Sequence, residues 1–131
     1  IGVPKNHTEA LKWYRIAAEQ GDALAQFALG AIYYDGYGVP EDYIEAVKWY
    51  RKAAEQGDHN AQYRLGVMYF LGRGVPEDKV MAYMWWNLAA AQGHEKATKA
   101  KGVISRVMNK EQIAEAQKMS REWVAKNNGI K

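Results

Sequence analysis

The sequence contains no cysteine, which excludes disulfides, thiolate metal sites and thiol catalysis. It also has no apolar run of about 18 residues, so we expect no membrane span. No secretory leader is recognisable, and Ile1 begins in the middle of a repeat. The compartment therefore stays open between the cytoplasm and the periplasm or the secreted state. Hydrophobic residues make up 48% and charged residues 25%, a composition typical of a folded domain.

Serine and histidine are scarce, and their positions do not suggest catalysis. Ser105 and Ser120 lie in neither a Gly-x-Ser-x-Gly nor a Ser-x-x-Lys motif. His7, His59 and His94 lack a second ligand at the spacing of a helical metal site. His59 and His94 are expected beside the caps of two helices, in structural or surface roles. We predict no catalytic residue, no metal site and no cofactor.

A glycine-rich loop sets the period of the chain. Residues 36–42, Gly-Tyr-Gly-Val-Pro-Glu-Asp, return at 72–78 as Gly-Arg-Gly-Val-Pro-Glu-Asp, 36 residues later, and residues 2–6 are a degraded copy. The glycines allow a tight turn, the proline directs the chain and the aspartate caps the next helix. The loops lack the Lys-Ser/Thr ending of a phosphate-binding loop. Their recurrence indicates a repeat array.

The segments between the loops show helical periodicity. Aromatic residues recur in register and predict packing between repeats: Trp13, Trp49 and Trp85, then Tyr14, Tyr50 and Trp86. Gly30 stands inside a helix, which costs about 1 kcal/mol relative to alanine. We expect the close approach of a neighbouring helix backbone to compensate for it.

The predicted helices have recognisable starts, and the array has a recognisable end. Reciprocal caps are predicted for Asn6 with Glu9, Asp42 with Glu45, and Asn109 with Gln112. Lys101 stands where the earlier copies have Leu29 and Leu65, and Ser105 stands where they have Tyr33 and Tyr69. No glycine-rich loop follows this third copy. The last helix is expected to close the array with one apolar face: Ile113, Ala116, Met119, Trp123 and Val124.

The repeated motif is Ala-Gln-x-x-Leu-Gly-x-x-Tyr, Gly-x-Gly-Val-Pro-x-Asp, then Ala-x-x-Trp-Tyr-Arg-x-Ala-Ala-Glu-Gln-Gly-Asp. It closely resembles the Sel-1-like repeat, a relative of the tetratricopeptide repeat. The resemblance implies an all-α, right-handed α-α superhelix of helix pairs with a C-terminal capping helix. We divide this single domain, 1–131, into the second helix of an incomplete repeat (5–20), two repeats (22–56 and 58–92), and a degenerate repeat with the capping helix (94–126).

The resemblance also implies a non-enzymatic scaffold or adaptor, with bacterial roles in signalling, the envelope, host contact or toxin partnership. In tetratricopeptide-type arrays the first helix of each pair lines a concave groove. The corresponding positions are Leu24, Phe27, Ala31, Tyr34 and Asp35, then Asn60, Tyr63, Val67, Phe70 and Leu71, then Lys96, Lys99, Val103 and Arg106. They suit a protein or peptide with apolar anchors and acidic residues. Recurrence of the aromatic positions is equally consistent with packing.

Two other functions stay open. A cysteine-rich branch of the family is associated with β-lactam hydrolysis, but this chain lacks the cysteines of that branch. Residues 93–131 hold nine Lys/Arg and four Asp/Glu, which favours an acidic partner and leaves nucleic acid as an alternative. The basic residues Lys96, Lys99, Lys101 and Arg106 do not alternate with aromatics as a base-stacking surface would require.

The first predicted helix, residues 5–20, lacks the helix with which its counterparts would pair. Its apolar face, including Trp13 and Tyr14, is therefore expected to be partly uncovered. We expect either a longer parent protein or a second copy of the chain to cover this face.

Overall fold

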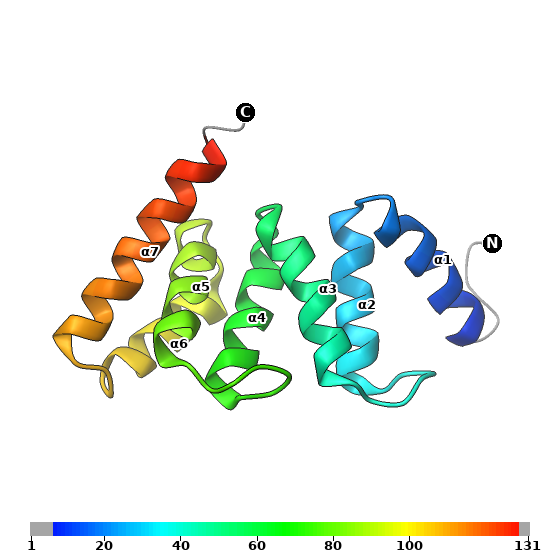
Figure 1. Cartoon of the computed structure of the whole chain (residues 1–131), viewed down its shortest axis with the longest axis horizontal. Coiled ribbons are helices and arrows are strands. Elements are labelled where there is room, and N and C mark those ends of the chain that lie inside the picture. Colours follow the sequence, from blue (N-terminus) through cyan, green and yellow to red (C-terminus); the bar gives the residue numbers. More distant parts are fainter. Residues whose placement is uncertain (1–6, 129–131) are drawn as a thin grey trace.

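The computed structural model describes residues 7–128, and over this range it contains seven α-helices and no strand. The helices stand side by side in a row, with α1 at one end and α7 at the other (Figure 1). The predicted all-α helical repeat solenoid is confirmed. The helices are α1 (His7–Glu19), α2 (Ala23–Asp35), α3 (Tyr43–Glu55), α4 (His59–Leu71), α5 (Lys79–Ala91), α6 (Glu95–Ser105) and α7 (Lys110–Asn128).

Aspartate caps start four of the helices. The side chains of Asp22, Asp42, Asp58 and Asp78 each accept the backbone N–H three residues later, at 2.9–3.1 Å. Each cap satisfies one of the N–H groups that a helix start leaves without an intrahelical partner. The loop aspartates therefore fix where the second helix of each repeat begins.

The reciprocal caps are only partly as predicted. Asn109 and Gln112 exchange both hydrogen bonds, at 2.8 and 3.0 Å. For Asp42 with Glu45 the prediction is wrong for one of the two bonds, the one from the Asp42 N–H to the Glu45 carboxylate. That carboxylate instead accepts from Trp49 Nε1 at 3.2 Å. The Asp42 N–H instead donates to the Tyr33 carbonyl. The predicted cap at Asn6 lies outside the described residues.

The repeated loop has positions that only glycine fits. Gly36 and Gly72 end α2 and α4 in the left-handed conformation, with φ of 70° and 68°. Gly74 also has a positive φ, and a Cβ there would lie 2.4 Å from the Tyr43 carbonyl oxygen. The second loop thus packs directly on the first turn of α3.

Glycines inside α2 and α4 make room for aromatic rings. A Cβ on Gly30 would lie 2.6 Å from the Tyr50 ring, and one on Gly66 would lie 2.4 Å from the Trp86 indole. The expectation of a neighbouring backbone at Gly30 is therefore wrong, because a ring from the following helix occupies this space. The 20-residue spacing from glycine to ring is the same in both repeats.

A ladder of glutamine side chains joins successive repeats. Gln26 donates to the Ala18 carbonyl at 3.1 Å, and Gln56 donates to the Gln26 side-chain oxygen at 2.8 Å. The same pair of bonds recurs 36 residues later, from Gln62 to Ala54 and from Gln92 to Gln62. Gln26 and Gln62 are buried, so the ladder satisfies polar groups that would otherwise destabilise the core.

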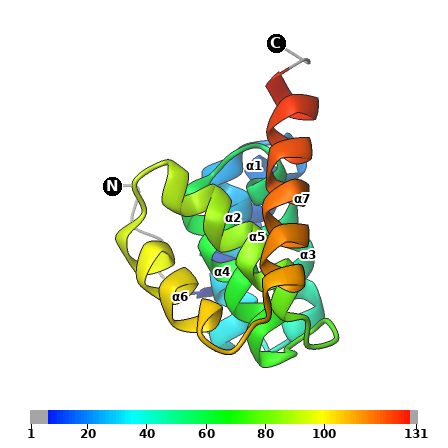
Figure 2. The same ribbon diagram turned by 90° about the vertical axis from the view of Figure 1, so that its left-hand side faces the viewer.

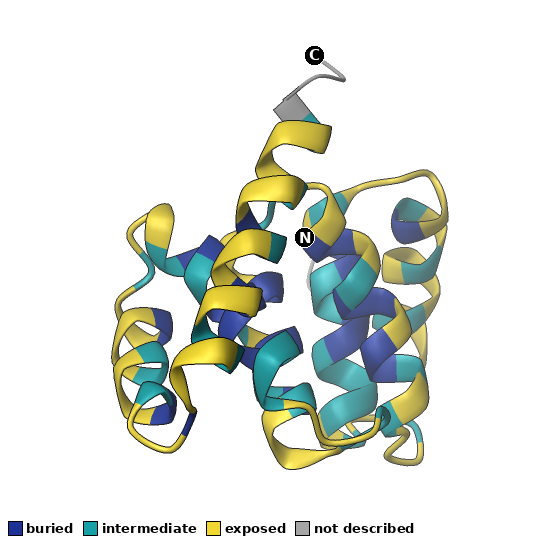
Figure 3. Ribbon diagram, turned by 60° about the vertical axis from the view of Figure 1, so that its left-hand side comes forward, coloured by how far each residue is buried: buried dark blue, intermediate teal, exposed yellow. Residues whose placement is uncertain are grey.

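The last helix packs on α5 rather than pairing closely with α6. Ser120 donates to the Met84 carbonyl at 3.4 Å, and the Trp123 ring meets Trp85 with centroids 6.1 Å apart. Viewed along the row, α6 and α7 lie on opposite sides of the molecule (Figure 2). Most of α7 is exposed (Figure 3). The predicted apolar face is correct for Ala116, Met119 and Trp123, but Val124 is 41% exposed.

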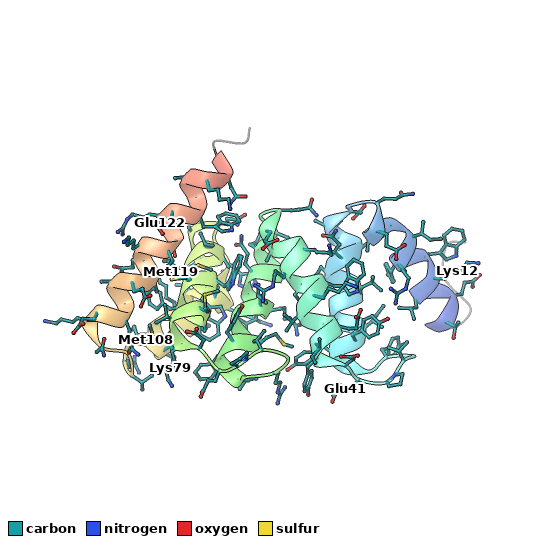
Figure 4. All side chains as sticks on the ribbon, viewed as in Figure 1. Lys12, Glu41, Lys79, Met108, Met119 and Glu122 are labelled. Carbon is teal, nitrogen blue, oxygen red and sulfur yellow. The ribbon has the colours of Figure 1, made fainter. Side chains whose placement is uncertain are left out.

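Burial separates the first helix from its counterparts. Trp49, Tyr50, Trp85 and Trp86 are buried, which confirms their predicted packing role. Their counterparts on α1 are not, since Trp13 is 60% and Tyr14 is 42% exposed. Lys12 lies on the same outer end of the row (Figure 4). The apolar face of α1 is thus partly uncovered, as expected, since Ala18 is buried while Trp13 and Tyr14 are exposed. None of the described helices combines the length and the apolarity needed to cross a bilayer.

Candidate functional site

A cavity of about 380 Å³ lies between α4 and α6, and we call it the α4–α6 crevice. Five of the predicted groove residues line it, which are Tyr63, Phe70, Lys96, Lys99 and Val103. The remaining wall comes from residues that the sequence had not assigned to the groove. The lining residues are Tyr63, Phe70, Trp86, Lys96, Lys99, Ala100, Val103 and Ile104.

The aromatic side of the crevice is held in place by neighbouring structure. The Trp86 indole lies against Gly66 and donates from Nε1 to the Tyr63 carbonyl at 3.0 Å. The Phe70 and Tyr63 rings lie 5.7 and 6.5 Å from the Trp86 ring, measured between centroids. These rings are therefore positioned before any ligand arrives, which reduces the ordering cost of binding.

The other side of the crevice is basic. Lys96 and Lys99 project from α6 and are exposed. Within residues 7–128 neither lysine forms an ion pair with a carboxylate. Arg106, the third basic residue predicted for this groove, is exposed near the end of α6 and does not line the crevice. An apolar floor beside two unpaired ammonium groups complements an apolar anchor with a neighbouring carboxylate.

A histidine fixes the start of α6 beside this crevice. His94 is the N-cap, and its Nδ1 accepts the Ala97 N–H at 3.1 Å. The sequence placed His94 next to a cap position, but it is the cap itself. Its ring stacks on Tyr63 with centroids 4.8 Å apart, and its Nε2 lies 3.1 Å from Asn60 Oδ1. Burial, then His59, Lys96 and Arg64, lower the pKa of His94 below its ordinary value.

The groove positions predicted on α2 are dispersed. Leu24 is 75% exposed, whereas Phe27 is half-buried with its ring 5.6 Å from that of Tyr50. Tyr34 packs against Tyr43 with centroids 5.2 Å apart and accepts a hydrogen bond from Arg73. None of these side chains lines the α4–α6 crevice. The other two positions are the half-buried Ala31 and the exposed Asp35.

The remaining positions predicted on α4 contact neighbouring repeats or lie on the surface. Asn60 is exposed and bonded to His94. Val67 is half-buried and packs against the core cluster shared by α5, α6 and α7. Leu71 is 46% exposed at the end of α4. The predicted positions that line the α4–α6 crevice therefore come from α4 and α6, and none comes from α2.

The part of the crevice that sequence reasoning missed had a detectable signal. Trp86 was assigned only to packing, but it follows Gly66 by 20 residues as Tyr50 follows Gly30. That spacing places the Trp86 ring over α4, where one part of the ring packs against Gly66 and another part lines the crevice. Ala100 and Ile104 had no comparable signal, because their counterparts on α4, Arg64 and Met68, had not been assigned to the groove.

His59, His94 and both serines take part in structural contacts, whereas the side chain of His7 lies outside the described part of the structure. The His59 and His94 rings meet edge to face with centroids 5.4 Å apart, a proximity that sequence spacing did not reveal. No group of three potential metal-binding side chains occurs among the described residues. Ser105 donates to the Gly102 carbonyl and buried Ser120 donates to the Ala116 carbonyl. The Ser105 hydroxyl therefore bonds within its own helix, whereas the Ser120 hydroxyl also reaches the Met84 carbonyl on α5.

The family model described as the Sel1 repeat matches residues 1–22, 23–58 and 59–94. The chain belongs to the Sel1 repeat family, whose members are generally protein-interaction scaffolds rather than enzymes. No curated protein matches the chain significantly. The matched segments end where His94 caps α6, so the closing segment α6–α7 lies beyond them.

Solved structures support the same assignment. The protective antigen c5321 of uropathogenic Escherichia coli strains, which displays an SLR fold, is 35% identical with a TM-score of 0.88, over 91% of this chain and 26% of that chain. A Sel1 repeat protein from Oxalobacter formigenes is 43% identical with a TM-score of 0.74, over 78% of this chain and 42% of that one. The cysteine-rich protein B of Helicobacter pylori is 25% identical with a TM-score of 0.69, over 72% and 71%. This chain thus spans well under two thirds of the first two.

Proposed function

We propose that this chain is a non-enzymatic protein-interaction scaffold. Its ligand is a peptide or protein segment that places an apolar side chain in the α4–α6 crevice and acidic side chains beside Lys96 and Lys99. The observation that supports this proposal is the crevice itself. It combines fixed aromatic rings with two exposed lysines that have no ion-pair partner within the described residues.

A selection from a random peptide display library on the wild-type chain tests the proposal. We expect enriched peptides to share an apolar anchor flanked by Asp or Glu. Phe70→Ala removes an aromatic wall that is only partly buried, so it should weaken a selected peptide about tenfold. Tyr63→Ala should weaken it further, because Tyr63 also supports His94.

The matched control is Leu24→Ala, which removes an exposed apolar side chain near the start of α2, outside the crevice. Peptide affinity should be unchanged by this substitution, and all three variants should retain the helical circular dichroism of the wild type. Equal affinity for wild type, Phe70→Ala and Tyr63→Ala would show that the ligand binds elsewhere. Failure to enrich any peptide would also count against the proposal.

A charge reversal separates peptide binding from general attraction to acids. Lys99→Glu should weaken the selected peptide, whereas Lys118→Glu on the exposed surface of α7 should not. If both reversals weaken binding equally, the basic C-terminal part acts only through its net charge. That result would favour the nucleic-acid alternative, which a gel-shift series at increasing salt concentration then tests.

A further inference from the structure

We infer that His94 is a pH-sensitive latch that holds the start of α6, and with it the basic side of the α4–α6 crevice, against α4. This inference rests on the proposed function only where it concerns ligand affinity. The latch itself is a property of the fold. It joins two observations, which are the position of His94 in the repeat and the contacts that its ring makes.

The first observation is a substitution within the repeat. The corresponding N-caps of α2 and α4 are Asp22 and Asp58, spaced 36 residues apart, and the next position in the series is His94. Aspartate accepts a backbone N–H over the whole neutral and mildly acidic range. A histidine ring accepts through Nδ1 only while that nitrogen is unprotonated. The third cap of the series is therefore the one that titrates near neutral pH.

The second observation is that both ring nitrogens are engaged. Because Nδ1 accepts from the Ala97 N–H, the neutral ring carries its hydrogen on Nε2 and donates it to Asn60 Oδ1. The ring also stacks on Tyr63, which lines the crevice. The other side-chain hydrogen bond from α6 to a neighbouring helix, from Lys101 to Asn87, leads to α5 instead. His94 is thus the polar side-chain link between α6 and α4 in the described part of the chain.

The groups around His94 oppose its protonation. His59 and Arg64 act on it from α4 and Lys96 acts on it from α6, and each of the three lowers the pKa of His94. From α5, the Ala89 carbonyl accepts the His94 N–H, and the side chains at that helix end are uncharged. Glu95 follows on the first turn of α6. A proton on Nδ1 removes the cap and adds a charge beside Arg64 and Lys96.

The sign of the pH effect follows from the direction of the shift. The pKa of His94 is lower in the folded protein than in the unfolded chain, so the unfolded chain takes up the proton first. The stability contributed by the neutral latch is complete above the ordinary histidine pKa. It is lost as pH falls from there through the folded pKa. Acidification therefore loosens α6 and the lysines it carries, and alkaline conditions restore them.

Hydrogen exchange tests the latch without any ligand. Protection factors of the Ala97 and Thr98 amides, corrected for intrinsic rates, should fall about fivefold between about pH 7.5 and about pH 5.5 in the wild type. His94→Asn supplies an uncharged cap that does not titrate, so its protection should stay constant across that range. His59→Asn removes a side chain that lowers the pKa of His94, so the wild-type decrease should persist with its midpoint at higher pH. Unchanged protection in the wild type, or an equal loss in His94→Asn, would overturn the inference.

Binding completes the test. The peptide selected on the wild type, labelled with fluorescein, should bind about fivefold more weakly at about pH 5.5 than at about pH 7.5, and His94→Asn should lose this difference. If hydrogen exchange changes with pH as predicted but no peptide binds at either pH, the latch is supported and the proposed ligand is rejected. Binding that is independent of pH in the wild type would instead reject the control of the crevice by the latch.

Discussion

The regular repeats, α2–α5, and the closing segment, α6–α7, follow the same 36-residue series but differ in how their helices are joined. In the regular part, Gly30 and Gly66 accept rings, and Gln26 and Gln62 link neighbouring repeats. In the closing segment, Gly102 occupies the next glycine position and a Cβ there would touch nothing within 4 Å. Both regions are helical, so they differ in the side chains that pack against each helix and not in secondary structure.

The closing segment shows how the array changes its packing. Helix α7 lies against α5 through Ser120 and Trp123, so it covers α5 without placing a ring over Gly102. The Gly102 face of α6 stays open, because a Cβ there would meet nothing within 4 Å, and the neighbouring Val103 is exposed. Because α7 packs on α5, α6 is held mainly by α5 and by the His94 contacts. The space between α4 and α6 therefore stays open as the α4–α6 crevice.

The largest effect is expected from filling the glycine contact. Gly66→Val places branched carbon atoms where the Trp86 indole lies 2.4 Å from an added Cβ, so we expect a loss of about 3 kcal/mol of stability. Gly102→Ala meets open space and should stabilise by about 0.5–1 kcal/mol through helix propensity. Urea denaturation followed by circular dichroism measures both. Equal destabilisation at the two sites would remove the distinction between the regular repeats and the closing segment.

The next effect is expected from the buried glutamine ladder. Gln62→Leu keeps the side-chain volume but leaves the Ala54 carbonyl and the Gln92 amide without this partner, so we expect a loss of about 2 kcal/mol. The control, Gln117→Leu, removes an exposed amide on α7 with a 3.5 Å bond to Tyr83, and should cost less than about 0.5 kcal/mol. Urea midpoints provide the comparison. A Gln62→Leu variant as stable as the wild type would show that the ladder contributes no net stability.

Local sequence patterns predicted the architecture well because each loop repeats the same physical requirements. The glycine turns, the aspartate caps and the buried Trp49 and Trp85 all follow from residues within one repeat and its period. The identity of the neighbour at Gly30 did not follow, because a glycine signals close approach without saying which atoms approach. Only the structure shows that Tyr50 supplies them.

The candidate site was less predictable because it depends on where the series changes. Tyr63, Phe70, Lys96 and Lys99 were assigned to the groove and line the α4–α6 crevice, while Arg106 does not. Arg106 stands 36 residues after Phe70, but α6 ends at Ser105 whereas α4 continues to Leu71, so this transferred position falls beyond the helix that lines the crevice. The contact of His94 with Asn60 also joins residues 34 apart, which no local pattern specifies.

The smallest effect is expected from the half-buried Arg–Tyr contacts that join each second helix to the next repeat. Arg51 donates to the Tyr69 hydroxyl at 2.8 Å and lies over that ring, and Arg15 contacts Tyr33 in the same way. Arg51→Met should lose about 1 kcal/mol of folding stability, because the methionine keeps the apolar stem but loses the hydrogen bond and the cation–π contact.

In the closing segment, Lys101 contacts Asn87 and Tyr83 instead. Lys101→Met should cost about half as much in urea denaturation, since ammonium contacts less ring surface than guanidinium. If Lys101→Met costs more than Arg51→Met, α6 depends more on its contact with α5 than the regular repeats depend on theirs, and the loosening of α6 by acid should then be smaller than expected.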